Sequence, residues 1–365
     1  MVVDKRASPQ AIHLRGVALP DDEVIDLWVD GDRISHEVIP GAETVMHRGW
    51  LLPGLVDVHT HPGADSPGDH LDDALLRRDA EAHRDSGVTL FRAPGAAGRL
   101  PAWLGDDPDL PRVRSAGPWL ATEKGFFPGW GRRESLEMLP DAAVEEAQAS
   151  GGWCKVIADW SFDDEPERRY GPTVPPDVLQ EIVRRVHAIG GRVAVHSQHE
   201  DGCSAAVLAG ADSLEHGMHL RLDLLDRMAE QGTVLVPTMC AFSGIKDSLR
   251  RLPPEPDAWG RWRSVGWQRH PNLVRCAYEA GVTILAGTDG PAGIIADEVD
   301  CLVAAGVPGD VAVGGASWTA RSWLGFGGLE HGAPADIVGY DEDPRVQPGV
   351  LRHPARIILR GRVVR

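Results

Sequence analysis

The sequence lacks the features that mark several large classes of protein. Its five cysteines include no Cys-x-x-Cys pair and are odd in number, which argues against a disulfide framework and indicates reduced thiols. No apolar run approaches the length that spans a membrane, and the first residues, Met1 to Arg6, lead into no apolar segment of the signal-peptide type. We therefore expect a cytoplasmic protein with no membrane partner.

Positive charge is also scarce. The chain has 54 acidic and 37 basic residues and a formal net charge of −17, which argues against nucleic-acid binding because phosphate contacts need a clustered positive face. Only four of the basic residues are lysines, so a lysine within an apolar strand does not reflect a lysine-rich composition. The 42% hydrophobic and 25% charged residues, over 365 positions, are typical of a globular protein with a full core.

From Leu55 onward, short apolar strands alternate with helical patterns. The eight strand candidates are residues 55–59, 88–93, 113–121, 153–158, 192–196, 213–215, 233–237 and 283–286. The helical patterns between them are residues 71–86, 142–150, 176–189, 204–209, 222–231 and 272–280. This alternation predicts an α/β protein with a (β/α)8 barrel of the TIM type over residues 55–324. An open doubly wound sheet would need a glycine-rich phosphate loop after the first strand, where this chain has His59-Thr60-His61-Pro62 instead.

The two chain ends have a different texture. Brief β-type runs broken by turn residues occupy residues 11–19, 24–29 and 33–38, and similar runs return at 336–340 and 355–364. We predict that residues 1–54 and 325–365 pair into one small β-sandwich domain.

Polar side chains stand at the ends of the predicted strands. His59 and His61 are two residues apart, so both imidazoles project from the same face of the first strand and can bind one divalent cation. His196, His216 and Asp289 end later strands, and the active face of a barrel lies at the carboxyl ends of its strands. Taken singly, each also fits a structural role, such as a hydrogen-bonded histidine or an aspartate that begins a turn.

Lys155 lies among apolar residues of the fourth predicted strand. A buried unpaired ammonium is costly and tends to lose its proton. A neutral lysine amine can take up carbon dioxide and become a carbamate, which can bridge two cations as a carboxylate would. The alternative is a lysine paired with a buried acid.

This constellation resembles the amidohydrolase superfamily, and in particular its imidazolonepropionase- and prolidase-like dinuclear branch with a carboxylated lysine. The matching segments are residues 53–61, 87–92, 153–157, 194–196, 210–217, 236–238, 287–289 and 332–338. The resemblance implies two divalent metal ions, with zinc as the default and other first-row ions left open. His59, His61 and Asp289 would hold one ion, His196 and His216 the other, and the carbamate of Lys155 would bridge them.

The resemblance also implies a reaction. A metal-bridging hydroxide would attack a carbonyl, and Asp289 would pass the proton to the leaving amine. We therefore expect a zinc-dependent hydrolase of an amide (C–N) bond in a peptide-like or N-acyl amino acid substrate. The alternative is a processing amidohydrolase that acts on a modified or cyclised peptide or amidine in natural-product biosynthesis. A one-metal deaminase would normally lack Lys155, and a binding scaffold would have lost ligands; a homo-oligomer is compatible with the sequence.

Four residues outside the ligand set are predicted to contact substrate: Arg92, Trp130, His199 and Trp262. The segment that follows the fifth strand contains both His196 and His199, and we favour His196 as the ligand because it ends the apolar run. His199 would then face substrate or cap the next helix. Trp262 belongs to the tryptophan- and arginine-rich residues 253–267, which would form either a lid or a cover over the rim of the barrel.

Overall fold

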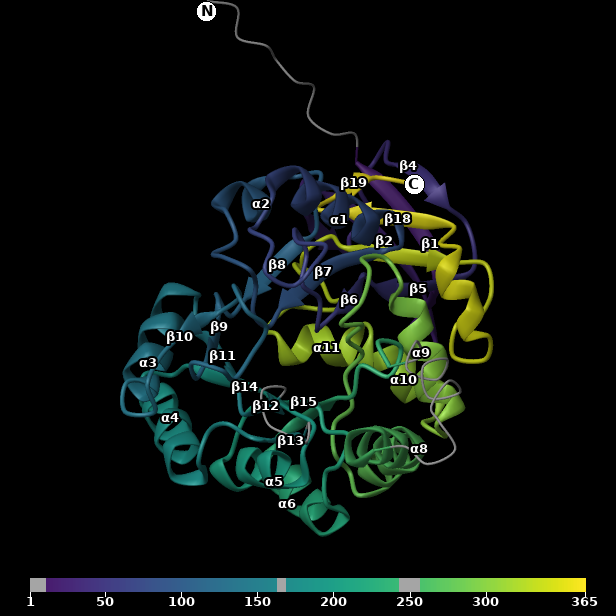
Figure 1. The fold of residues 1–365 in the computed structure, drawn as a ribbon. Coiled ribbons are helices and arrows are strands. Elements are labelled where there is room, and N and C mark those ends of the chain that lie inside the picture. Colours follow the sequence, from purple (N-terminus) through teal and green to yellow (C-terminus); the bar gives the residue numbers. More distant parts are fainter. Residues whose placement is uncertain (1–10, 163–168, 243–256) are drawn as a thin grey trace, which may run out of the picture.

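The computed structural model describes residues 11–162, 169–242 and 257–365. Figure 1 shows the central strands on the inside of the molecule and a series of helices around the outside, with β1, β2 and β4 beside β18 and β19 at one side. None of the helices within these residues has both the length and the apolar character needed to cross a membrane.

The strands at the centre pair in parallel and form two sheets. The first contains β6 (Leu55–Asp57), β7 (Val88–Ala93) and β8 (Arg112–Ser115). The second has the order β10 (Arg132–Arg133), β9 (Trp119–Ala121), β11 (Trp153–Ile157), β14 (Arg192–Ser197), β15 (Ser213–His216) and β16 (Val234–Val236). All residues of β6, β7, β11, β15 and β16 are buried, as expected for parallel strands that are covered on both faces.

Hydrogen bonds link these two sheets at both edges, at the first through Ala96 N–H, which follows β7 and donates to Gly117 O at 3.0 Å. The predicted strand 113–121 is two strands, because β8 pairs with β7 whereas β9 pairs with β11, and Gly117 (φ 71°) and Pro118 lie between them. At the other edge, residues 283–286 form no regular strand, but Leu285 N–H donates to Leu235 O at 3.0 Å and Val58 N–H donates to Ala286 O at 3.0 Å. The segment predicted as the eighth strand therefore lies between β16 and β6.

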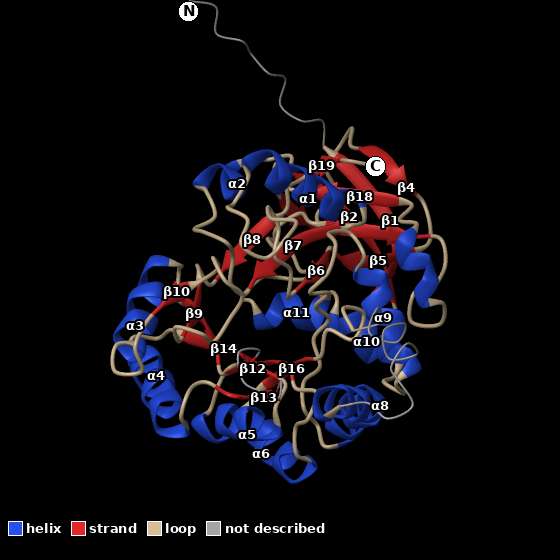
Figure 2. Cartoon of the chain, viewed as in Figure 1, coloured by secondary structure: helices blue, strands red, loops and turns tan. Residues whose placement is uncertain are grey.

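Helices follow most of the central strands. They are α1 (Asp73–Asp85), α2 (Ala102–Asp106), α3 (Leu139–Ala149), α4 (Pro176–Ala188), α5 (Glu200–Ala209), α6 (Leu225–Gln231), α8 (Ala258–Glu279), α9 (Ile295–Ala304), α10 (Gly309–Gly315) and α11 (Trp318–Trp323), with 3-10 turns η1 (Leu222–Leu224) and η2 (Pro348–Arg352). Figure 2 shows α3, α4, α5, α6 and α8 arranged around the outside of the strands. The helices predicted at residues 142–150 and 176–189 agree with α3 and α4 to within three residues at each end.

Helix α8 departs most from the prediction. We expected a helix over residues 272–280, preceded by a lid or a rim cover at residues 253–267. The structure has one 22-residue helix that begins after Asp257, whose side chain accepts a hydrogen bond from Gly260 N–H at 2.7 Å. Pro271 lies inside this helix, and a proline is normally read as a helix boundary. Trp262 is therefore helical, while residues 253–256 of the predicted segment lie outside the described residues.

Strands within residues 12–53 and 337–363 form one eight-stranded sheet. It contains β1 (Ile12–Ala18), β2 (Glu23–Asp30), β3 (Arg33–Ser35), β4 (Glu43–Met46), β5 (Trp50–Pro53), β17 (Ile337–Tyr340), β18 (Arg356–Leu359) and β19 (Arg362–Val363). Strand β17 pairs antiparallel with both β5 and β18, so residues from the two ends of the chain are direct neighbours. The hydrogen bonds thus join all eight strands, which come from both parts of the chain, in a single sheet.

Asp336 connects this sheet to the central strands. Its carboxylate is fully buried and accepts hydrogen bonds from Arg112 Nε at 2.7 Å, Arg321 Nη2 at 3.1 Å and the backbone N–H of Arg360 at 2.9 Å. Although burial raises its pKa, the neighbouring Arg321 and Arg112 guanidinium groups hold the pKa below its ordinary value. Arg321 is also fully buried, so each charge depends on the other for compensation.

We predict that Asp336→Asn lowers the free energy of unfolding by about 3–5 kcal/mol, because it leaves the buried Arg321 guanidinium without its counter-charge. Urea unfolding followed by tryptophan fluorescence measures this change. The matched control is Asp109→Asn, whose carboxylate is 68% exposed and pairs with Arg362 at 2.9 Å. Since surface pairs contribute little, that variant should lose about 1 kcal/mol at most. Equal effects of the two substitutions would contradict a structural role for Asp336.

Candidate metal centre

The six predicted ligands meet at the carboxyl ends of the central strands. His59 and His61 follow β6, Lys155 lies in β11, and His196 lies in β14. The other two are His216, the last residue of β15, and Asp289, which follows the 283–286 segment. All six line one cavity of about 180 Å³.

His59, His61 and Asp289 form the tightest group in this cavity. The Nε2 atoms of the two histidines are 3.1 Å apart, and Asp289 Oδ1 lies 3.3 Å from His61 Nε2 and 3.7 Å from His59 Nε2. One donor atom from each of the three side chains can be chosen so that all lie within 4.8 Å of one another. Two imidazoles and a carboxylate that converge in this way fit the ligand set of a divalent cation such as zinc.

His196 and His216 lie beside this group. Their ring centroids are 4.6 Å apart, and the His216 ring centroid is 5.1 Å from that of His59. His216 Nδ1 is hydrogen-bonded to Thr238 Oγ1 at 2.8 Å, and His196 Nε2 to the hydroxyl of Tyr170 at 2.8 Å. The structure therefore brings together both predicted histidine pairs, with hydroxyl groups at the ring nitrogens of the second pair.

Lys155 has the environment that a ligating amine derivative needs. Its side chain is fully buried, and Nζ has no hydrogen-bond partner within the described part of the chain. Burial lowers the pKa of the Lys155 amine to about 8, although the nearby Glu215 and Asp289 carboxylates act in the opposite direction. A neutral amine is thus accessible near physiological pH.

The protonation states of the other side chains also suit a cation. Burial lowers the pKa of His59 to about 4 and those of His196 and His216 well below the ordinary value, so all three rings are neutral near pH 7. Burial would raise the pKa of Asp289, but His59 and His61 hold it below its ordinary value and keep the carboxylate ionised. Neutral imidazole and ionised carboxylate are the forms that bind metals.

Glu215 orients His59 from outside the cavity. Its Oε2 accepts a hydrogen bond from His59 Nδ1 at 2.6 Å, and its Oε1 accepts one from Arg92 Nη2 at 2.7 Å. A histidine that donates from Nδ1 keeps Nε2 free as a ligand atom. Burial raises the pKa of Glu215, but Arg92, Lys155 and His59 together hold it well below its ordinary value. Our sequence reasoning missed this role, although Glu215 directly precedes the predicted ligand His216 in a buried strand.

Arg92 lies beneath the cavity, not in its wall. It is fully buried, its Nε donates to Val58 O at 2.7 Å, and its guanidinium carbon lies 5.0 Å from the Trp153 ring centroid and 5.1 Å from that of Trp323. The prediction that Arg92 contacts substrate is therefore corrected: its charge neutralises Glu215. The side chain points inward from a strand, β7, that is buried on both faces.

Three of the strand ends at the site have unusual backbone conformations. His216, Thr238 and Asp289 have φ values of 70°, 48° and 44°, in the left-handed region that non-glycine residues seldom adopt. Each is held by hydrogen bonds: His270 Nε2 bonds to His216 O at 2.9 Å, Asp289 N–H donates to His59 O at 2.7 Å, and the Glu298 carboxylate accepts from the two N–H groups that follow Thr238. Such strain is often found at functional sites.

The remaining predicted contacts differ in position. Trp130 lines the cavity and stacks on Trp119, with ring centroids 4.9 Å apart. His199 caps α5, since its Nδ1 accepts a hydrogen bond from Asp201 N–H at 3.2 Å, which is the second of the two roles considered for it. Trp262 lies outside the cavity wall and stacks between Tyr170 and His219, with ring centroids 4.8 and 4.6 Å away.

Comparison with known families identifies this arrangement. The sequence model described as "Amidohydrolase family" matches residues 50–364. Uncharacterized proteins of Mycobacterium tuberculosis and Mycobacterium bovis are 40% identical to the chain and cover 98% of it and 96% of their own length. The ochratoxinase of Aspergillus niger is 26% identical and covers 94% of this chain and 81% of its own.

Solved structures agree with this result. A Xaa-Pro dipeptidase with bound methionine in its active site superposes with a TM-score of 0.80 at 24% identity, covering 97% of this chain and 99% of its own. The A. niger ochratoxinase structure superposes with a TM-score of 0.80 at 23% identity, covering 97% and 96%. These likenesses support an α/β fold of the TIM-barrel type for this chain.

We predict that Glu215→Gln weakens divalent-metal binding by about 10- to 100-fold, because the amide no longer fixes the His59 ring through a charged acceptor. Isothermal titration calorimetry, in which zinc is added to the metal-depleted protein, measures the affinity. The matched control is Glu146→Gln: this glutamate is also buried and bonds to Arg99 at 2.6 Å, but it lies in α3 away from the site. Unchanged zinc affinity in Glu215→Gln would show that the His59–Glu215 contact is not part of the centre.

Proposed function

Since this chain belongs to the amidohydrolase family, we propose that it is a metal-dependent hydrolase that cleaves the amide bond of a peptide-like or N-acyl amino acid substrate. The observation that carries the proposal is the convergence of His59, His61 and Asp289 on one point of the cavity at the strand ends. The family and its prolidase and ochratoxinase relatives support amide hydrolysis in general, and the substrate class is our own inference.

We also infer the finer architecture. Residues 55–324 would form a closed (β/α)8 barrel that carries the catalytic groups, and residues 1–54 and 325–365 would form the end domain. The hydrogen bonds from 283–286 to β16 on one side and to β6 on the other support closure. The pairing of β17 with β5 supports a shared end domain.

The side chains fit two divalent ions, and zinc is the metal we propose. His59, His61 and Asp289 would hold one ion, and His196 and His216 the other. Bound there, the two ions would lower the pKa of a water molecule and polarise the scissile carbonyl. The chemistry of the donor set supports this assignment, because neutral imidazoles and an ionised carboxylate are typical zinc ligands.

Lys155 would join the two ions as a carbamate. Its neutral amine would add to carbon dioxide, forming an N–C bond and releasing one proton, and the product carries one negative charge. The support is the buried Nζ, which has no hydrogen-bond partner among the described residues and lies in the wall of the same cavity. An anion formed there would face the histidine pairs without any competing hydrogen bond.

Asp289 would move the proton. Its carboxylate is ionised, 29% exposed and 3.3 Å from His61, so it can reach both a water molecule and a substrate nitrogen. It would accept a proton from the attacking water and deliver it to the amide nitrogen as the C–N bond breaks. The products are a carboxylic acid and an amine.

We predict that the purified protein carries about two divalent ions per chain and that Lys155→Ala loses metal and activity together, because the bridging anion is gone. Elemental analysis alongside an amidase assay measures both quantities. Lys124→Ala is the control, since Lys124 lines a different cavity and should leave the metal content unchanged. Wild-type metal content and turnover in Lys155→Ala would reject the carbamate bridge.

We predict that Asp289→Asn lowers kcat by about 10²–10⁴-fold, more than it raises KM, because the carboxylate acts on the chemical step. The amide oxygen can still touch a cation, so the loss of metal should be partial. The assay is hydrolysis of a panel of dipeptides and N-acyl amino acids, with zinc content measured in the same samples.

Asp297→Asn is the control for this experiment, because Asp297 is an exposed carboxylate on α9 that pairs with Arg352. It should match the wild type. If Asp289→Asn keeps a near-normal kcat with full metal content, Asp289 is neither a proton shuttle nor an essential ligand. If the metal-loaded wild type hydrolyses no amide in the panel, the proposed function itself fails.

A further inference from the structure

The side of the cavity that faces the candidate ligands is aromatic. We call this surface the aromatic wall, and its members are Trp119, Phe126, Phe127, Trp130 and Trp160. The Trp119 ring centroid lies 5.1 Å from that of His61, so the wall begins directly beside the ligand cluster. Trp160 contacts both phenylalanine rings, at centroid distances of 4.8 and 4.6 Å and in edge-to-face orientations. A group bound next to the ligands would therefore meet ring faces and edges.

The cavity offers little else to a substrate. Among the described residues that line it, the charged side chains outside the histidines are Lys155 and Asp289, and both belong to the candidate ligand set. Gln198 and Ile157 complete the lining. The ions and the scissile amide would share this space of about 180 Å³, so the group that flanks the amide would lie against the aromatic side of the cavity.

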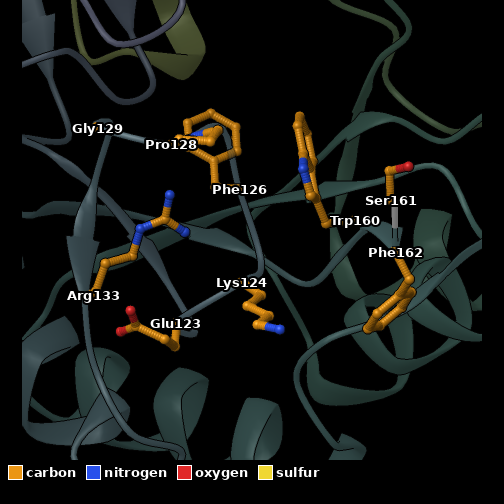
Figure 3. A pocket seen from close by; sticks show the side chains of 9 residues that line it. All are labelled: Glu123, Lys124, Phe126, Pro128, Gly129, Arg133, Trp160, Ser161 and Phe162. Carbon is orange, nitrogen blue, oxygen red and sulfur yellow. The ribbon is translucent and has the colours of Figure 1, made fainter. Parts of the chain in front are cut away.

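The aromatic wall is held in place from behind. Arg133 donates hydrogen bonds to Thr122 O at 3.1 Å and to Phe127 O at 2.5 Å, which fixes the loop that carries both phenylalanines. Figure 3 shows the Arg133 guanidinium directed toward Phe126, with Trp160 on the opposite side of a second cavity of about 450 Å³. Phe126 and Trp160 line both cavities, so these two rings separate the ligand cluster from the second cavity.

We propose that the aromatic wall selects amides that carry an aromatic ring one to three bonds from the scissile C–N bond. The ring would stack on Trp119 or pack against the edges of Phe126 and Trp160, while the amide lies at the ligand cluster. This inference rests on the proposed function and adds the substrate class: aryl or arylalkyl amides, in preference to amides whose flanking groups are small and aliphatic.

A matched substrate series tests the proposal. One arm varies the acyl group on a common amine through acetyl, cyclohexanecarbonyl, benzoyl and phenylacetyl. A second arm keeps acetyl and varies the amino acid through alanine, cyclohexylalanine and phenylalanine. Burial of one ring is worth about 10- to 100-fold in kcat/KM, so a ring-bearing substrate in at least one arm should exceed its smallest member by that factor. The cyclohexyl compounds have the bulk of a ring but cannot stack. Their kcat/KM should therefore lie between that of the aromatic substrate and that of the smallest member of the same arm.

Variants connect the preference to the wall. Trp160→Leu and Phe126→Leu should each reduce the ratio of kcat/KM for the ring-bearing substrate to that for the acetyl or alanine substrate by about tenfold, because they remove one ring and keep an apolar side chain. Trp28→Leu is the control: Trp28 stacks on His13 in the end sheet, with ring centroids 4.8 Å apart, and should leave the ratio unchanged. Quenching of tryptophan fluorescence by benzoate, compared with cyclohexanecarboxylate and acetate, gives a binding readout that needs no turnover.

The outcomes are distinct. Equal or faster hydrolysis of the acetyl and alanine substrates by the metal-loaded wild type would overturn the aromatic selection and leave amide hydrolysis standing. A preference that survives both Trp160→Leu and Phe126→Leu would also overturn it, because the ring would then bind elsewhere. If no amide in either arm is hydrolysed, the proposed function fails, and tighter binding of benzoate than of acetate would still support an aromatic binding site.

Discussion

The hydrogen bond from the His59 ring to the Glu215 carboxylate is the contact on which the rest of the site depends. It joins the residue that follows β6 to β15, and through the pair of Glu215 with Arg92 it reaches β7 as well. Glu215 and Arg92 are fully buried and His59 is nearly so, and a buried charge is stable only while its partner is present. The network therefore fixes the positions of three strands relative to one another and sets which nitrogen of His59 faces the cavity.

Two buried aspartates hold the loops of the site in place, because their side-chain carboxylates accept hydrogen bonds from backbone N–H groups. Asp57 accepts hydrogen bonds from His59 N–H at 3.0 Å and Thr288 N–H at 3.1 Å, so one side chain controls the turns that present both His59 and Asp289. Asp159 holds the turn that follows β14 in the same way, because its carboxylate accepts hydrogen bonds from the N–H groups of Gln198 and His199. The strained conformations of His216, Thr238 and Asp289 are held by other hydrogen bonds, which involve His270, the Glu298 carboxylate and the His59 carbonyl.

The sequence predicted most of the strands and which side chains come together at their ends, because both depend on local patterns. Strand β7 was placed at its observed bounds, and His59, His61 and Asp289 were placed at strand ends that the structure brings together. The roles of Glu215 and Arg92 could not be read in this way, since they depend on which strands become neighbours inside the fold. Helix α8 was misjudged for a different reason: Pro271 removes one backbone donor, yet the helix runs through it, with His270 and Leu273 buried on either side.

The aromatic wall and the ligand cluster also depend on each other. Burial is the main cause of the low pKa values of His59, His196 and His216, and the rings of Trp119, Phe126 and Trp160 line the same cavity as these imidazoles. In such a setting a cation and a developing charge interact more strongly with the protein than they would in water. A substrate with an aromatic flanking group loses the least free energy of hydration on entering this cavity, because an aromatic ring needs no hydrogen-bond partner there. One set of side chains can thus keep the ligands neutral and select the substrate, so a substitution in the aromatic wall should be judged by both its selectivity and its metal affinity.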